Sequence, residues 1–170
     1  WTLPGNVALA VHNTIEYVKV KSSFEGKDNY FILAKKKVEE YFKESDAITI
    51  VEEFTGDKLV GKTYKPVFPY FIDKEIENKE NIWKIWHADF ITDTDGTGIA
   101  HEAPAFGAED MELAKANKIP VIKHVKMDGT FIDAVTDFAG MKVKKKDDTQ
   151  SADIEVIKWL AHNGKLFEKH

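Results

Sequence analysis

The residues best suited to chemistry gather in one segment, residues 95–110, which reads DGTGIAHEAPAFGAED. Gly96 and Gly98 flank Thr97, and glycine lets a backbone approach a ligand closely and take a positive φ. His101 comes three residues after Gly98, and Asp110 comes nine residues after His101. A turn, a short strand and a helix start in this order often line a pocket. We therefore take this segment as the candidate site.

Residue types alone leave several interpretations of this segment open. The Gly-Thr-Gly lacks the third glycine of a dinucleotide fingerprint and the Gly-Lys-Ser/Thr of a phosphate loop, so a tight turn explains it as well. His101 fits a general base, a metal ligand or a buried structural histidine, and no second histidine follows at the spacing of a metalloprotease helix. Asp110 in the first turn of a helix complements the helix dipole, and it could equally hold an ammonium group.

The elements that must position this segment are short and mixed in type. Apolar runs predict strands over residues 7–11, 17–20, 48–51, 83–91 and 99–102. Apolar spacing predicts helices over 29–45, 108–117 and 151–163, with Gly164 ending the last one. We expect extended chain at 59–68 and 121–125, a charged surface loop at 73–82 and an Asp-Gly hairpin turn at 127–131. This order predicts an α+β domain with a closed or nearly closed, antiparallel-rich sheet and no internal boundary.

The amino-acid composition excludes several classes of protein and of catalytic site. The chain has 170 residues, 43% of them hydrophobic, which is typical of a folded globular domain. It has no cysteine, which excludes disulfides, thiolate zinc sites and a cysteine nucleophile, and no apolar run of about 18 residues that could span a membrane.

Charge argues against a general nucleic-acid binder, because the net charge is −5. Every basic residue is lysine and none is arginine, so any phosphate contact must use lysine, a backbone N–H or a hydroxyl. The lysine runs at 35–37 and at 142 and 144–146 are interpreted either as solvated faces or as contacts to an RNA backbone.

Two motifs in combination resemble the isoleucyl-tRNA synthetases. Residues 1–6 (WTLPGN) resemble the family's Trp-Thr-Leu-Pro-x-Asn segment, and residues 96–110 are similar to its Gly-Thr-Gly-hydrophobic-x-His-x-Ala-Pro-x-x-Gly-x-Asp/Glu-Asp motif. Further matches lie at 128–131, 137–140 and 159–167. The part matched is the editing domain, the connective peptide inserted into the catalytic domain. Signatures of the synthetic site are missing, so the resemblance implies no aminoacylation by this chain.

The resemblance implies a β-barrel-like core with peripheral helices, one editing domain over residues 1–170 excised from a larger class I synthetase. The implied activity is hydrolysis of valine from mischarged isoleucine tRNA after transfer, and the resemblance leaves editing before transfer open. Isoleucine exceeds valine by one methylene, which adds only ~1–3 kcal/mol of binding free energy, a value taken from this same enzyme family. A second, smaller pocket that admits valine and excludes isoleucine therefore supplies the remaining discrimination. The implied partners are the 3′ end of the mischarged tRNA and the remainder of the synthetase, in the cytoplasm, with no cofactor, no metal and no membrane.

The resemblance also assigns roles to individual residues. Asp110 would bind the α-ammonium of the misattached valine, and His101 would border the aminoacyl group and help exclude isoleucine. Substrate-binding positions would be Thr2, Gly96, Thr97, Gly98 and Phe106. The family's threonine run directly precedes the position of Trp1, and we expect activity to depend on it. The alternatives are a valyl-tRNA synthetase editing domain and a module that binds the tRNA 3′ end but is inactive without the parent enzyme.

Overall fold

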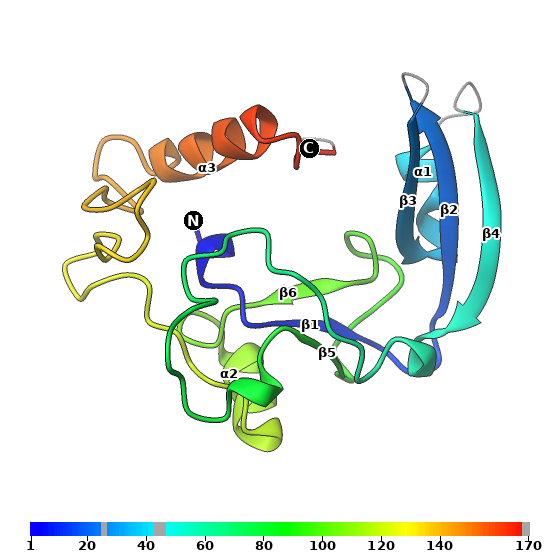
Figure 1. Cartoon of the computed structure of the whole chain (residues 1–170), viewed down its shortest axis with the longest axis horizontal. Helices are drawn as coiled ribbons and strands as arrows, with labels where there is room; N and C mark the ends of the chain where they lie inside the picture. Colours follow the sequence, from blue (N-terminus) through cyan, green and yellow to red (C-terminus); the bar gives the residue numbers. More distant parts are fainter. Residues whose placement is uncertain (25–26, 43–46, 168–170) are drawn as a thin grey trace.

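A computed structural model describes residues 1–24, 27–42 and 47–167, which form two small sheets and three α-helices (Figure 1). The strands are β1 (Ala8–Val11), β2 (Glu16–Phe24), β3 (Lys27–Ala34), β4 (Ile48–Thr55), β5 (Lys84–His87) and β6 (Ala100–Glu102). The α-helices are α1 (Val38–Tyr41), α2 (Ala108–Asn117) and α3 (Ser151–His162). Four 3₁₀ turns lie at Leu3–Gly5, Lys35–Lys37, Gly56–Lys58 and Lys79–Asn81. This confirms the predicted α+β class. None of these helices is both long and apolar enough to cross a membrane.

The central sheet is built on β1, which pairs with β5 on one side and β6 on the other. The β1–β5 pair is parallel and the β1–β6 pair is antiparallel. Strand β1 can occupy the centre because its residues are apolar and Ala8, Ala10 and Val11 have no exposed surface. Leu9 lies opposite His101, so the sheet itself fixes the position of the candidate histidine.

The second sheet, in the order β3-β2-β4, is antiparallel throughout and stands to one side of the central sheet (Figure 1). It shows that the predicted helix over 29–45 is wrong at its start, because residues up to Ala34 belong to β3. Phe31 and Leu33 alternate on one face and lie opposite Val20 and Val18, so period-two pairing with β2 overrides the approximate helical spacing. The end of that predicted helix lies partly outside the described residues.

The prediction of one closed or nearly closed sheet is also wrong for the residues that the structure describes. Their strands form two separate three-stranded sheets, in the orders β5-β1-β6 and β3-β2-β4. The segments predicted as extended chain, at 59–68 and 121–125, form no named strand and contribute isolated bridges such as Thr63–Lys84 and Val125–Phe131. Gly61 and Pro66 interrupt the first of these segments, and proline cannot donate a ladder hydrogen bond.

The two longer helices follow their sequence signals. Helix α2 begins and ends where predicted, and α3 ends one residue earlier than expected. Gly164 takes a φ of 62°, and the N–H of Lys165 donates to the carbonyl of Leu160 at 2.8 Å, which closes the end of α3. Both helices contribute to the largest apolar core, which also includes the inward residues of β1.

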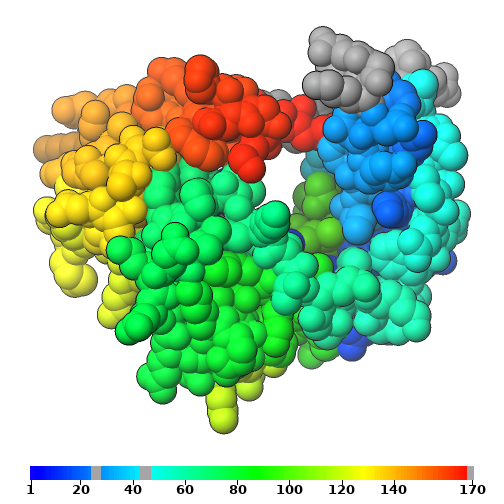
Figure 2. All heavy atoms as spheres, viewed as in Figure 1, coloured from blue at the N-terminus to red at the C-terminus, as the bar shows by residue number. Residues whose placement is uncertain are grey.

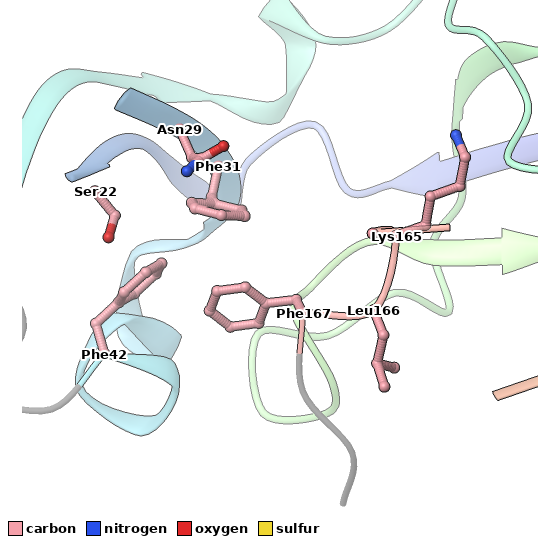
Figure 3. Close-up of a pocket in the computed structure, with 8 residues that line it drawn as sticks. Ser22, Asn29, Phe31, Phe42, Lys165, Leu166 and Phe167 are labelled. Carbon is pink, nitrogen blue, oxygen red and sulfur yellow. The ribbon is translucent and has the colours of Figure 1, made fainter. Parts of the chain in front are cut away.

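After α3 the chain returns to the second sheet. The ring of Phe167 lies 4.8 Å from that of Phe31 and 5.5 Å from that of Phe42, centroid to centroid (Figure 3). These rings line a cavity of about 470 Å³ that contains none of the predicted site residues. Figure 2 shows the molecule hollowed between the second sheet and the rest of the chain.

Candidate functional site

His101 is held on both ring nitrogens by residues of the N-terminal segment. The amide nitrogen of Asn6 lies 3.3 Å from Nδ1, and the hydroxyl of Thr2 lies 3.0 Å from Nε2. The orientation of the Asn6 amide is fixed, because its nitrogen donates to the Ala8 carbonyl at 2.8 Å and its oxygen accepts from the hydroxyl of Tyr64. Since an amide nitrogen only donates, Nδ1 of His101 accepts, and the ring proton sits on Nε2 and is donated to Thr2.

This arrangement favours a neutral His101. Burial lowers the pKa of His101, an effect that the nearby carboxylate of Asp110 opposes. With its lone pair at Nδ1 occupied and its Nε2 protonated, the ring has no free nitrogen to accept a proton. His101 is therefore arranged as a fixed wall and a hydrogen-bond donor, not as a general base.

Asp110 is held at one carboxylate oxygen and open at the other. It lies in the first turn of α2, where the helix dipole stabilises a negative charge. Its Oδ2 accepts the N–H of Ala103 at 2.7 Å, and within the described part of the chain Oδ1 receives no hydrogen bond. A Cβ atom on Gly107 would lie 2.3 Å from Oδ1, so glycine at this position leaves room for the carboxylate. Asp110 can therefore offer one preoriented oxygen to a cation.

The glycine loop is fixed to the second sheet. Tyr17 donates its hydroxyl to the carbonyl of Gly98 at 2.6 Å, and the N–H of Ala34 donates to the carbonyl of Thr97 at 2.7 Å. Gly98 has a φ of 74°, and a Cβ there would lie 2.6 Å from Cβ of Ala34. Both the left-handed backbone and the close approach require glycine. The expected turn is thus a rigid element between the two sheets.

One cavity, of about 410 Å³, brings most of the predicted residues together. It runs along the free edge of β6, and its lining includes Gly96, Gly98, His101 and Asp110. Thr2 adjoins this cavity through its hydrogen bond to His101.

Besides Thr2, two predicted positions are not in the lining of this cavity. Thr97 directs its hydroxyl to the carbonyl of Ile99 at 3.4 Å. The ring of Phe106 packs edge-on against Trp1, with centroids 4.9 Å apart, and against His124 at 5.0 Å. Phe106 therefore supports the N-terminal segment in this structure.

Sequence reasoning missed His124 as part of the site's support. Its side chain has no exposed surface, and its Nε2 lies 3.1 Å from the carbonyl of Trp1, to which it donates. A Cβ on Gly5 would lie 1.9 Å from Nδ1, so the N-terminal segment packs directly on the ring. Burial lowers the pKa of His124, which keeps it neutral. His124 thereby holds the segment that carries Thr2, and nothing in its local sequence indicates this burial.

Glu102 is a second missed residue. Its side chain is 1% exposed, it contributes to the lining of the same cavity, and its Oε2 has no hydrogen-bond partner among the described residues. Burial raises the pKa of Glu102 to about 7, and the negative charges of Asp110 and Glu109 add to this effect. The only sequence signal that could have indicated Glu102 is its place between His101 and the Ala103-Pro104 pair.

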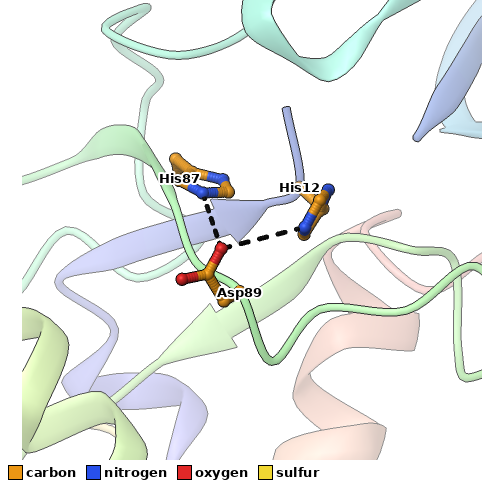
Figure 4. A group of neighbouring side chains, drawn as sticks. All are labelled: His12, His87 and Asp89. Carbon is orange, nitrogen blue, oxygen red and sulfur yellow. Dashed lines mark hydrogen bonds and ion pairs between the residues drawn. The ribbon is translucent and has the colours of Figure 1, made fainter. Parts of the chain in front are cut away.

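Within the described ranges, one cluster has ligand atoms close enough to hold a metal: His12, His87 and Asp89 (Figure 4). Asp89 Oδ1 lies 3.0 Å from Nε2 of His87 and 3.9 Å from Nε2 of His12. The backbone N–H groups of Asn13 and Thr14 donate to the two Nδ1 atoms at 3.2 and 3.3 Å. The ring protons therefore sit on the Nε2 atoms, which would have to lose them to bind a metal. The arrangement fits a hydrogen-bonded cluster better than a metal centre.

Nearly the whole chain is similar to one segment of isoleucine–tRNA ligases, although no protein-family model matches it. It is 39% identical over 170 residues to the isoleucine–tRNA ligase of Bdellovibrio bacteriovorus, covering 99% of this chain and 15% of that protein. It is 38% identical over 168 residues to that of Clostridium novyi, covering 99% and 14%. It is 36% identical over 174 residues to a probable cytoplasmic isoleucine–tRNA ligase of Dictyostelium discoideum, covering 98% and 16%. The chain thus spans about 15% of the length of such relatives.

The fold also has a solved counterpart. The crystal structure of GlLeuRS-CP1 superposes with a TM-score of 0.67, covering 99% of this chain and 80% of that chain. Sequence identity over the superposition is 15%, so this likeness establishes the fold alone.

Proposed function

We propose that this chain, which is homologous to a segment of isoleucine–tRNA ligases, is an editing domain that hydrolyses valine from mischarged isoleucine tRNA. The substrate is an ester between the amino acid and the terminal ribose of the tRNA. The domain works within the larger synthetase, in the cytoplasm, and acts on the ester after transfer. The observation that carries the proposal is the carboxylate of Asp110, which has one oxygen anchored and one open beside the cavity that His101 and the glycine loop line.

The α-ammonium group of the bound amino acid is the cation that fits this carboxylate. An N⁺–H to carboxylate hydrogen bond is stronger than a neutral one. Because Ala103 already holds Oδ2, binding the ammonium at Oδ1 costs little further ordering of the side chain. Asp110 thus orients the ester carbonyl relative to the cavity wall.

The wall formed by His101 limits the size of the amino acid. Rotation of the ring would break its hydrogen bonds to both Thr2 and Asn6. We expect this wall to resist the extra methylene of isoleucine and to leave room for valine. This is the physical basis of the size sieve that we propose.

Hydrolysis itself needs no covalent intermediate on the protein. A positioned water adds to the ester carbonyl, the bond from the carbonyl carbon to the ribose oxygen breaks, and that oxygen takes a proton. Valine and free tRNA are the products. An aminoacyl ester is already activated, so orientation supplies much of the rate enhancement. The neighbouring ribose hydroxyl is the group that we expect to assist the proton transfer.

The test is amino-acid release from valyl- and isoleucyl-isoleucine tRNA by this chain, its Asp110→Ala variant and a Glu112→Ala control. Glu112 is an exposed acid on the same helix that does not line the cavity. The proposal predicts selective release of valine, lost in Asp110→Ala and kept in the control. Cleavage of both esters at one rate would contradict the size sieve. If neither is cleaved, the assay is repeated on a chain extended by the upstream threonine run. Binding without cleavage in that chain would favour a module that only receives the tRNA 3′ end.

A further inference from the structure

The two lysine runs that the sequence could not distinguish differ in their partners. Each lysine of the run at Lys35–Lys37 forms an ion pair with a carboxylate of the fold. The three Nζ atoms lie 2.6 Å from Glu53, 2.7 Å from Asp93 and 2.6 Å from Glu40. The positive charge of this run is therefore largely neutralised within the domain.

The run at Lys144–Lys146 is exposed and, within the part of the chain that the structure describes, forms no ion pair. Two acids, Asp147 and Asp148, follow it directly, and among the described residues neither forms an ion pair with it. The preceding residue, Val143, is buried, and its N–H donates to the carbonyl of Gly129 at 2.9 Å. The run thus presents three lysines without an ion-pair partner from an anchored point of the chain.

The first of these charges lies at the border of the candidate site, and the other two follow it directly in the chain. The ammonium of Lys144 is 5.7 Å from the centroid of the Trp1 ring, within the range of a cation–π contact. The next residue after Trp1 is Thr2, whose hydroxyl contacts His101. An RNA whose terminal ester is held beside Asp110 would have its last phosphates near this border.

We propose that Lys144, Lys145 and Lys146 bind the backbone phosphates of the RNA 3′ end next to its esterified nucleotide, with Lys144 positioned by the Trp1 ring. This inference rests on the proposed function for the identity of the ester. The net charge of the chain is −5, so the domain as a whole repels RNA. A local cluster of lysines without ion-pair partners is what allows the 3′ end to approach, since the chain has no arginine that could supply the positive charge.

The experiment compares two triple variants with the same change of charge. In one, Lys144, Lys145 and Lys146 are replaced by alanine, and in the control Lys35, Lys36 and Lys37 are replaced. Each is assayed on valyl-isoleucine tRNA and on the valyl ester of adenosine, which has no phosphate. The first variant should raise KM for the tRNA with little change of kcat and should leave hydrolysis of the adenosine ester unchanged. The control should change neither.

Salt dependence gives an independent measure. Three phosphate contacts to a single strand contribute a slope of about −2 in log affinity against log salt. The loss of kcat/KM between about 50 mM and about 200 mM salt should therefore be roughly twentyfold smaller in the first variant. An unchanged KM and slope would overturn the proposal, as would an equal loss on both substrates.

Failure of the proposed function would be visible separately, because neither this chain nor the chain extended by the threonine run would then cleave either ester. In that case the lysines are tested alone with an RNA hairpin of the isoleucine-tRNA acceptor stem that carries no amino acid. Its binding is measured by fluorescence anisotropy. Weaker binding in the first variant than in the control supports the proposal, and equal binding contradicts it.

Discussion

Replacement of Glu102 by glutamine should remove a pH-dependent part of the domain's stability. The carboxyl is 1% exposed and its Oε2 has no partner, so its ionised form is poorly solvated in the folded protein. Its pKa rises from an ordinary 4.5 to about 7. The folded state therefore binds the proton more tightly than the unfolded state, and the stabilisation is present at low pH and lost as the pH rises through about 7.

The size of the effect follows from these two pKa values. A shift from 4.5 to about 7 corresponds to about 3 kcal/mol at its full extent. Between about pH 5.5 and about pH 8.5, linkage predicts that this group's contribution to the free energy of unfolding falls by about 2 kcal/mol. Glutamine has a similar shape and does not titrate. The free energies of unfolding of the two proteins should therefore differ by an amount that changes by about 2 kcal/mol over this range.

Urea unfolding of both proteins at several pH values measures this difference. Other titrating groups, including His101 and His124 with their lowered pKa values, contribute equally to both proteins and cancel. Glu112→Gln, at an exposed position on α2, is the matched control for the removal of a carboxylate. A difference between wild type and Glu102→Gln that stays constant with pH would refute the argument.

Three further predictions concern the parts that hold the site. Gly107→Ala should displace the Asp110 carboxylate, because the added Cβ falls 2.3 Å from Oδ1, and should raise KM for the valyl ester in steady-state assays without unfolding the domain. Asn6→Asp should replace the donor facing Nδ1 of His101 with an acceptor, so the pKa of that histidine should rise, as followed by NMR titration; an unchanged pKa would contradict the assigned tautomer. His124→Leu should lower the free energy of unfolding by about 1–3 kcal/mol through loss of a buried hydrogen bond, and His124→Gln, which keeps a donor, should recover part of it in urea unfolding.

Local signals in the sequence were sufficient for the parts of the fold that local interactions decide. The bounds of α2 follow from the Gly107 start and its acidic first turn, and the end of α3 follows from Gly164. The Asp128-Gly129 turn was predicted on the same grounds, and Gly129 takes the positive φ of 79° that glycine permits.

These local signals do not predict which strands pair with each other. Strand β3 has apolar residues that fit either period, and only the presence of β2 beside it selects the strand. The parallel pairing of β1 with β5 joins residues far apart in the sequence, so no local pattern predicts it. The separation into two sheets follows from such pairings, which is why a closed sheet was expected in error.

In the candidate site, too, some residues were predictable from the sequence and others were not. The motif segments indicated His101 and Asp110 by residue type, and the structure places both at one cavity. Their supports were not predictable, because the burial of His124 and Glu102 depends on how the N-terminal segment and α2 pack around them. Asn6 lay within a motif, yet its role in fixing the tautomer of His101 is visible only from its contacts.

The most direct test of the central claim asks whether Asp110 recognises the amino group. Valyl-isoleucine tRNA is compared with the same tRNA carrying the deaminated, α-hydroxy analogue of valine, using wild type and Asp110→Asn. A charged hydrogen bond of about 1.5–3 kcal/mol predicts that wild type prefers the amino substrate by roughly 10- to 150-fold in kcat/KM. Asp110→Asn should hydrolyse both esters with similar, low efficiency. If the variant keeps the wild-type preference, Asp110 does not hold the ammonium group, and the proposed site is wrong.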